Sequence, residues 1–164
     1  MSSLRLNGVE NVEVIPVALD VGTGWAYYST HVGSNGGLID ADDLLDRPGV
    51  VVPTFALDDI VSAPVGLLKM DVEGAEGRVV KGAQRIISQD RPVVTTELKD
   101  EMLRRVSGTS VEEYLGWFEQ QGYRAALLEK GSTEERPYAS VSALLAAIGD
   151  TDELHDVLLV PAAD

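Results

Sequence analysis

Pro64–Glu76 has the sequence PVGLLKMDVEGAE, and this stretch decides the fold of the chain. Its apolar run from Val65 to Met70 is too short for a helix and does not alternate with polar residues, so it predicts a strand buried on both faces. Two carboxylates, Asp71 and Glu73, follow directly, and an amphipathic helix is expected after them. Because ligands of open α/β sheets bind beside the carboxyl ends of the strands, both carboxylates are candidate site residues.

The residues that follow predict a β-α-β unit. A helix ending near Ser88 precedes the apolar run Val93–Leu98, which predicts a second buried strand with Glu97 at its carboxyl end. Strands joined through a helix are parallel in nearly all known folds, so Glu97 is expected at the same edge of the sheet as Asp71 and Glu73. Three carboxylates at one edge are also compatible with a divalent-metal site. The structural alternative is that Asp71 caps the helix and the next acidic residues lie near the positive end of its dipole.

Length and composition limit the classes of function. A chain of 164 residues fits one domain, residues 1–164, with a single core. Its 27 acidic and 13 basic residues give a formal charge of -14, which argues against nucleic acid and anionic membranes as partners. The sequence has no cysteine for disulfides or thiolate metal sites, and its amino terminus lacks the pattern of a signal peptide, so a cytoplasmic protein is expected.

Local patterns predict the remaining elements. Ser110 and Glu113 form a capping box ahead of an apolar stripe, which predicts a helix that Gly122 ends. Asp58 or Asp59 is expected to cap a short turn. The other expected elements are the last turn of a helix at Leu4–Gly8, strands at Asn11–Leu19 (with a bulge or edge at Pro16), Trp25–Thr30, Gly49–Leu57, Tyr123–Glu129 and His155–Pro161, a charged loop at Lys130–Pro137, and a helix at Ser142–Ile148.

Two further stretches allow more than one interpretation. Asp20–Trp25, DVGTGW, has the spacing of a cofactor-binding glycine loop, but the aromatic and glycine-rich residues after it favour a turn that leads into a strand. Ser34–Pro48 is glycine-rich and acidic, which predicts a solvated loop. A calcium site is the alternative there, although the stretch lacks the closing Glu and the fixed glycine of an EF-hand. His31 has no second His nearby with which to share a metal, so it is expected to be a loop residue.

A resemblance to a known family rests on these same residues. LLKMDVEGAEGRVVKGAQRII, residues 67–87, followed by RPVVTTEL, residues 91–98, resembles the signature block of the FkbM family of S-adenosylmethionine-dependent methyltransferases. Upstream, residues 6–19 resemble the family's stretch that enters its third strand, and residues 55–60 resemble the segment before its fourth strand. In this register residues 20–30 correspond to a variable hairpin and not to the cofactor's glycine loop.

The resemblance implies a fold, an activity and a set of site residues. The fold would be the Rossmann-like class I methyltransferase fold, an α/β architecture with a mostly parallel sheet flanked by helices. The activity would be methylation of a hydroxyl group on a small molecule or sugar, with S-adenosylmethionine as the methyl donor. Asp71 or Glu73 would be the base, with Glu97 more often structural than catalytic. Ala18 and Leu19 would lie at the adenine side of the cofactor and Asp71 near its methionine end.

The chain also departs from the family pattern. Family members begin with a strand, a glycine-rich loop, a helix and a second strand, and the sequence given starts after these, so we expect a fold truncated at the N-terminus with weak or absent cofactor binding. The alternative function is a non-catalytic interaction module derived from such an enzyme.

The family's strand order makes a prediction about assembly. In the order 3-2-1-4-5-7-6 the absent strands would separate Asn11–Leu19 from the strand that ends at Met70. Either these two strands then pair directly, or a second copy of the chain covers the open edge, and a homodimer is the favoured expectation.

Overall fold

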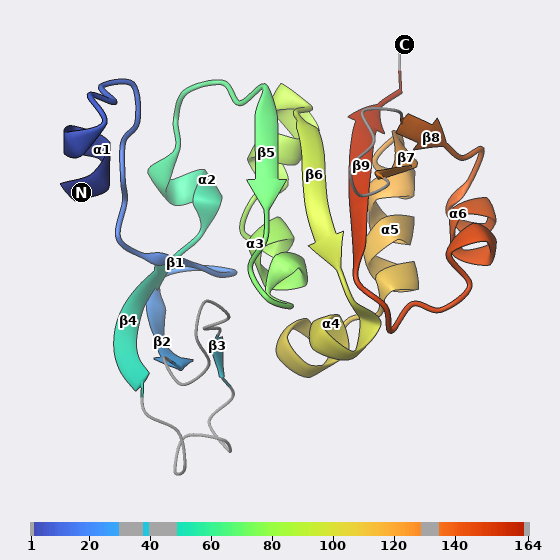
Figure 1. The fold of residues 1–164 in the computed structure, drawn as a ribbon, viewed down its shortest axis with the longest axis horizontal. Helices are drawn as coiled ribbons and strands as arrows, with labels where there is room; N and C mark the ends of the chain where they lie inside the picture. The colour runs from blue at the N-terminus through green and yellow to red at the C-terminus, as the bar shows by residue number, and fades with distance from the viewer. Residues whose placement is uncertain (1, 30–37, 40–48, 129–134, 163–164) are drawn as a thin grey trace.

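The computed structural model describes residues 2–29, 38–39, 49–128 and 135–162. Their strands form two sheets, one of four strands in the order β1-β4-β2-β3 and one of five strands in the order β5-β6-β9-β7-β8. In Figure 1 the four-stranded sheet lies at the lower left and the five-stranded sheet at the centre and right. The predictions for His31 and for the acidic stretch of residues 34–48, including the calcium alternative, lie outside the described residues apart from the two of β3.

The four-stranded sheet comes from the first third of the chain. It contains β1 (Ala18–Leu19), β2 (Gly24–Ser29), β3 (Leu38–Ile39) and β4 (Gly49–Phe55). The prediction of a turn at Asp20–Trp25 that leads into a strand is confirmed, because β2 begins at Gly24 and pairs antiparallel with β4. The glycine-loop interpretation is wrong, since such a loop would have to open a helix.

The strand predicted at Asn11–Leu19 is largely wrong. Of this stretch, only Ala18 and Leu19 form a strand, β1, which pairs in parallel with Thr54 and Phe55 of β4. The residues before them are exposed up to Pro16 and no described strand pairs with them, so their β-branched side chains have no sheet to join. The predicted helix turn ahead of them is confirmed, because α1 (Ser2–Leu6) is followed by Gly8 with φ 63°.

The five-stranded sheet confirms the predicted β-α-β unit. β5 (Leu67–Met70) runs parallel to β6 (Val93–Leu98), and β9 (His155–Pro161) lies between β6 and β7 (Tyr123–Leu128), antiparallel to both. The order β5-β6-β9-β7 is the one expected for the last four strands of the family fold. β8 (Glu135–Pro137) extends the sheet where a charged loop was predicted.

The expectation of a mostly parallel sheet is wrong. Among the described strands, β1 with β4 and β5 with β6 are the parallel pairs, and the other five pairings are antiparallel. Parallel neighbours need a crossover connection, such as the one through α3 that joins β5 to β6, whereas β9 runs in the direction opposite to both of its neighbours, β6 and β7.

β5 differs from the prediction of a strand buried on both faces. It is the edge strand of its sheet, and Leu67 has 64% of its surface exposed while Met70 has 2%. β1 belongs to the other sheet, where it pairs with β4, so the alternative in which the first strand pairs directly with the Val65–Met70 strand is wrong.

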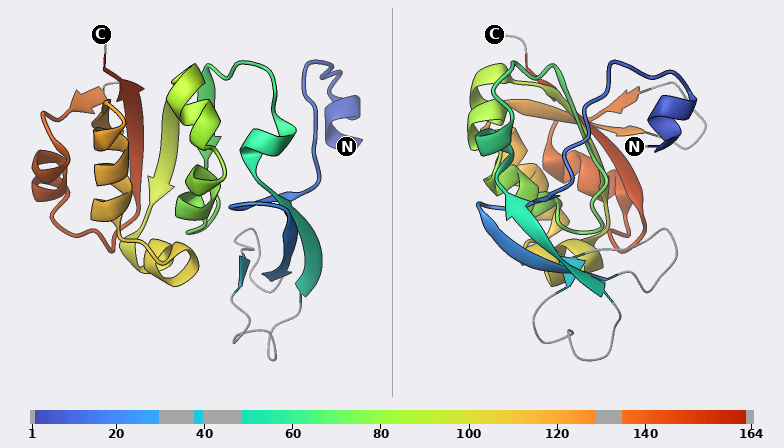
Figure 2. Two further views of the ribbon diagram at one scale, coloured as in Figure 1. Left: turned by 180° about the vertical axis from the view of Figure 1, so that it is seen from behind. Right: turned by 90° about the vertical axis from the view of Figure 1, so that its left-hand side faces the viewer.

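One face of the five-stranded sheet is covered by helices. α3 (Glu76–Lys81) and α5 (Val111–Gln120) lie on this face, as both views in Figures 1 and 2 show. The capping box of Ser110 and Glu113 is present as predicted, and Gly122 follows α5 with φ 74°. The other helices are α2 (Leu57–Ile60), the π-helix η2 (Ile86–Asp90), α4 (Asp100–Ser107), which was not predicted, and α6 (Val141–Ile148), which was.

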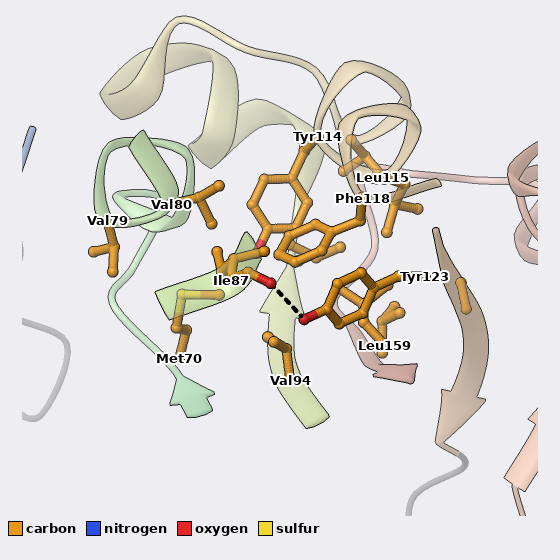
Figure 3. Packing of buried hydrophobic residues seen from close by; sticks show 14 of the residues in the cluster. Met70, Val79, Val80, Ile87, Val94, Tyr114, Leu115, Phe118, Tyr123 and Leu159 are labelled. Atoms are coloured by element: carbon orange, nitrogen blue, oxygen red, sulfur yellow. Dashed lines mark hydrogen bonds between the residues drawn. The ribbon is translucent and has the colours of Figure 1, made fainter. Parts of the chain in front are cut away.

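The hydrophobic core lies between this sheet face and the helices. Figure 3 shows Tyr114, Phe118 and Tyr123 in edge-to-face contact above Val94 and Leu159, with ring centroids 5.3 Å apart in both aromatic pairs. The Tyr123 hydroxyl donates a hydrogen bond of 3.3 Å to the Ile87 carbonyl, so its polar group is satisfied inside the core. No helix of the described residues is long and apolar enough to cross a membrane.

Candidate functional site

The turn after β5 carries the two leading candidate residues, Asp71 and Glu73. The Asp71 side chain is 50% exposed, and its carboxylate lies 4.0 Å from Lys69 Nζ. Glu73 is half-buried and has a left-handed backbone with φ 54°, followed by Gly74 with φ 95°. A side chain at Gly74 would meet the Met102 carbonyl oxygen at 2.5 Å, so only glycine allows α4 to approach this turn.

The predicted capping role of Asp71 is wrong. α3 begins after Ala75, and no side chain accepts a hydrogen bond at that N-cap. The carboxylate that stabilises this region belongs instead to Glu76, the first residue of α3. Its Oε1 accepts a hydrogen bond of 3.1 Å from the backbone N–H of Val72. The Glu76 side chain therefore folds back over the turn and does not cap the helix.

Glu76 is buried, with 2% of its surface exposed. Burial raises the pKa of its carboxyl group, and the negative charge of Asp71 raises it further. The backbone N–H groups of Glu76, Val72 and Gly74 act in the opposite direction because they stabilise the charged form. The sequence placed Glu76 near the positive end of the helix but offered no signal that its side chain would be buried.

A buried polar layer lies beneath and beside the turn. The Ser107 hydroxyl of α4 donates a hydrogen bond of 2.5 Å to the Gly74 carbonyl. The Tyr114 hydroxyl of α5 lies 3.5 Å from Thr96 Oγ1 of β6, and burial together with the charge of Glu76 raises the pKa of Tyr114. The Ser107 hydrogen bond therefore ties α4 to the turn that follows β5, and the Tyr114 contact ties α5 to β6.

Glu97 lies on β6 near this turn. Met70 pairs with Thr96 in the parallel register, so Asp71 and Glu97, one residue further on each strand, are level with each other. Glu97 is half-buried and stands opposite Asp156 of β9 in the antiparallel register. Within the described residues, however, no three His, Cys, Asp or Glu side chains are close enough to hold a metal ion. The divalent-metal alternative for Asp71, Glu73 and Glu97 stays a prediction.

The predicted adenine-side residues, Ala18 and Leu19, form β1 and are half-buried. The residue after them is Asp20, whose buried carboxylate accepts two hydrogen bonds from the Arg78 guanidinium of α3, one of 2.9 Å from Nε and a shorter one from Nη2. Burial alone would raise the pKa of Asp20, but the bonds from Arg78 and from the Val21 N–H lower it below its ordinary value.

This ion pair places β1 beside α3. A side chain at Gly82, just after α3, would lie 2.1 Å from the Asp20 carbonyl oxygen, so the helix end and the end of β1 are in direct backbone contact. Figure 1 shows the end of β1 reaching toward α3 below the tip of β5. The structure thus brings Ala18 and Leu19 to the same side of the molecule as the turn that carries Asp71.

A separate groove lies between α3 and α5. It has a volume of about 330 Å³, with Gly77 and Val80 on one side and Thr109, Tyr114 and Trp117 on the other. None of the predicted site residues lines this groove.

Comparison with known proteins agrees with this arrangement. The family model of the methyltransferase FkbM domain matches residues 3–125. A solved structure described as the methyltransferase FkbM from Methylobacillus flagellatus KT is similar to the chain with a TM-score of 0.55 and 16% identity, over 96% of this chain and 32% of that one. This likeness concerns the fold, and the chain spans about a third of the length of that protein. No curated protein matches the chain.

Proposed function

The chain belongs to the FkbM methyltransferase family, and from this membership we propose that it serves methyl transfer from S-adenosylmethionine to a hydroxyl group of a small molecule or sugar. The observation that carries the proposal is the family match over residues 3–125, which includes the turn with Asp71 and Glu73 at the carboxyl end of β5. Ligands of α/β sheets bind at this end of the strands.

The chain's own part in such a reaction is to orient the acceptor and take its proton. S-adenosylmethionine would supply an electrophilic methyl group when bound. An acceptor hydroxyl needs a base within hydrogen-bond reach. Asp71 fits this role because its side chain is half exposed, and Glu73 is the second candidate. Glu76 does not fit it, since its carboxylate is buried against backbone amides.

The described residues fit the cofactor in part. The half-buried apolar pair Ala18 and Leu19 suits the face of an adenine ring, and the Asp71 carboxylate suits the ammonium group of the methionine end. Among residues 2–29, 38–39, 49–128 and 135–162, no glycine-rich loop joins a strand to a helix, because Asp20–Gly24 leads into β2. We therefore expect this chain alone to bind the cofactor weakly or not at all.

The same observation favours a second candidate function, a non-catalytic interaction module derived from a methyltransferase. Calorimetric titration with S-adenosylmethionine and with its demethylated product distinguishes the two. Saturable binding that Asp71→Asn weakens, and that Asp59→Asn on the exposed side of α2 leaves unchanged, would support the enzyme. No heat of binding with either compound would favour the interaction module.

We also propose that the chain forms a homodimer through the free edge of β5. An edge strand with unpaired backbone groups and an exposed Leu67 tends to pair with another chain. Sedimentation at micromolar concentration should show a dimer that Leu67→Glu converts to a monomer. Val51→Glu is the matched control, because Val51 on β4 is also 64% exposed. A wild-type chain that remains monomeric at every concentration would contradict the dimer.

A further inference from the structure

The proposed chemistry gives no role to the buried carboxylate of Glu76. A carboxylate loses its hydration when it is buried, so the folded protein has to replace the lost hydrogen bonds. All the groups that favour the charged form of Glu76 belong to residues 72–76, the turn that follows β5 and the first residue of α3. The Glu76 side chain is therefore bound by the turn that carries the candidate base residues.

The backbone of this turn is unusual and needs support. Glu73 and Gly74 both have positive φ, 54° and 95°, and a left-handed conformation costs a residue other than glycine about 1 kcal/mol. Successive backbone N–H groups of a turn can point into one concave space that attracts an anion. In this protein the anion is the chain's own Glu76 carboxylate, with the Val72 N–H at 3.1 Å.

The outer side of the turn is held by α4. The Ser107 hydroxyl donates to the Gly74 carbonyl, and Gly74 packs against the backbone of Met102. These contacts involve Gly74 only. The N–H of Val72, which lies between Asp71 and Glu73, donates to the Glu76 carboxylate, while the Val72 carbonyl accepts a hydrogen bond of 3.2 Å from the Ala75 N–H.

We propose that Glu76 is a positioning residue, whose carboxylate accepts the backbone N–H of Val72 within the turn and so holds Asp71 and Glu73 at the carboxyl end of β5. The catalytic consequence rests on the proposed function, in which Asp71 or Glu73 acts as the base. The hydrogen-bonded clamp itself does not depend on that function.

Amide hydrogen exchange measured by NMR tests the clamp without any cofactor. Glu76→Gln keeps the size of the side chain but removes its charge, and Glu76→Asp keeps the charge but shortens the reach. Both should raise exchange at Val72 and Gly74 by about ten-fold or more, because hydrogen bonds to charged groups are the stronger ones. Exchange in the core strand β6 should stay unchanged.

Glu119→Gln is the matched control, because the Glu119 carboxylate accepts a hydrogen bond of 3.0 Å from the Val141 N–H in another part of the chain. It should raise exchange at Val141 and leave the turn unaffected. Unchanged exchange at Val72 and Gly74 in Glu76→Asp would overturn the proposal. If Glu76→Gln does not fold, the exchange measured in Glu76→Asp is sufficient to test the proposal.

Binding of the demethylated cofactor product supplies the second measurement. If Glu76 acts through the turn, Glu76→Gln should weaken binding about as much as Asp71→Asn, and the double variant should weaken it little further. Fully additive losses would overturn the positioning role. A wild-type chain that shows no binding at all would favour the interaction module over methyl transfer, and the exchange experiment would still decide the clamp.

Discussion

The two sheets of this protein are stabilised in different ways. The five-stranded sheet packs an apolar face against α3 and α5, and side chains such as Phe118, Leu115 and Val94 are completely buried there. The buried residues within the strands of the four-stranded sheet are polar, namely Ser29 and Thr54, and Asp20, directly after β1, is buried as well. Trp25 and Val51 on that sheet remain 76% and 64% exposed.

The four-stranded sheet is held to the rest of the molecule chiefly by polar contacts. Asp20 pairs with Arg78 of α3, and the Asp58 carboxylate of α2 accepts hydrogen bonds of 2.7 and 3.0 Å from the backbone N–H groups of Arg85 and Ile86. The difference between the two sheets indicates that the hydrophobic core determines the free energy of unfolding of the whole chain. A few carboxylates determine where β1 lies relative to the candidate site.

The largest expected effect comes from the core. Phe118→Ala should lower the free energy of unfolding by about 3–5 kcal/mol, because it removes a fully buried ring from the centre of the aromatic cluster. Val51→Ala on the four-stranded sheet should change it by less than about 0.5 kcal/mol. Urea denaturation followed by circular dichroism measures both, and equal losses would contradict the difference between the two regions.

The second-largest effect is expected from the ion pair between Asp20 and Arg78, which joins the two regions. Asp20→Asn removes the negative charge that faces the Arg78 guanidinium. We expect the free energy of unfolding to fall by roughly 2 kcal/mol, below the range for fully buried pairs because Arg78 is partly exposed. The two tryptophans, Trp25 on β2 and Trp117 on α5, allow fluorescence to follow each region separately. In Asp20→Asn the Trp25 transition should precede that of Trp117, and coincident transitions would show that the ion pair does not couple the sheets.

A fall in pH should weaken the ion pair between Asp20 and Arg78. The pKa of Asp20 in the folded chain lies below its ordinary value of 3.8, so its stabilising contribution is complete above that value. The contribution is lost as the pH falls through the lowered pKa of the folded state, because the proton then binds the unfolded chain first. The Trp25 transition should depend less on pH in Asp20→Asn than in the wild type, with Asp59→Asn as the control. An unchanged pH dependence would assign the effect to another carboxylate.

The smallest effect is expected at the candidate site itself. Asp71→Asn and Glu73→Gln should each shift the melting temperature by only a few degrees, in line with a loss of ~1 kcal/mol or less. Asp71 has half of its side chain in solvent and Glu73 lies in the turn outside the core. Unfolding of Asp71→Asn would show that this carboxylate is structural.

Local signals account for most of the elements that were predicted correctly. The capping box at Ser110, the glycines that end α5 and α6, and the apolar stripe of α3 each act within a few residues, so they can be recognised along the chain. α4 was missed because its buried residues are only Leu103 and Ser107, and its Asp100–Arg104 ion pair leaves no apolar period.

The candidate site was predicted in part for the same reason. The sequence placed Asp71, Glu73 and Glu97 after two parallel strands, and the register makes Asp71 and Glu97 level with each other. The burial of Glu76 and the pairing of Asp20 with Arg78 were not predicted, since both depend on side chains that meet only after the turn and β1 have packed against α3.

The sequence by itself determined the family, the β-α-β unit and the carboxylates at its carboxyl end, because those features depend on residue type and short spacing. Only the tertiary structure decided that β1 pairs with β4, that β5 remains an edge strand and that the sheets are mixed. Strand pairing depends on which segments meet across long distances along the chain, and a period of apolar residues identifies a strand without identifying its neighbour.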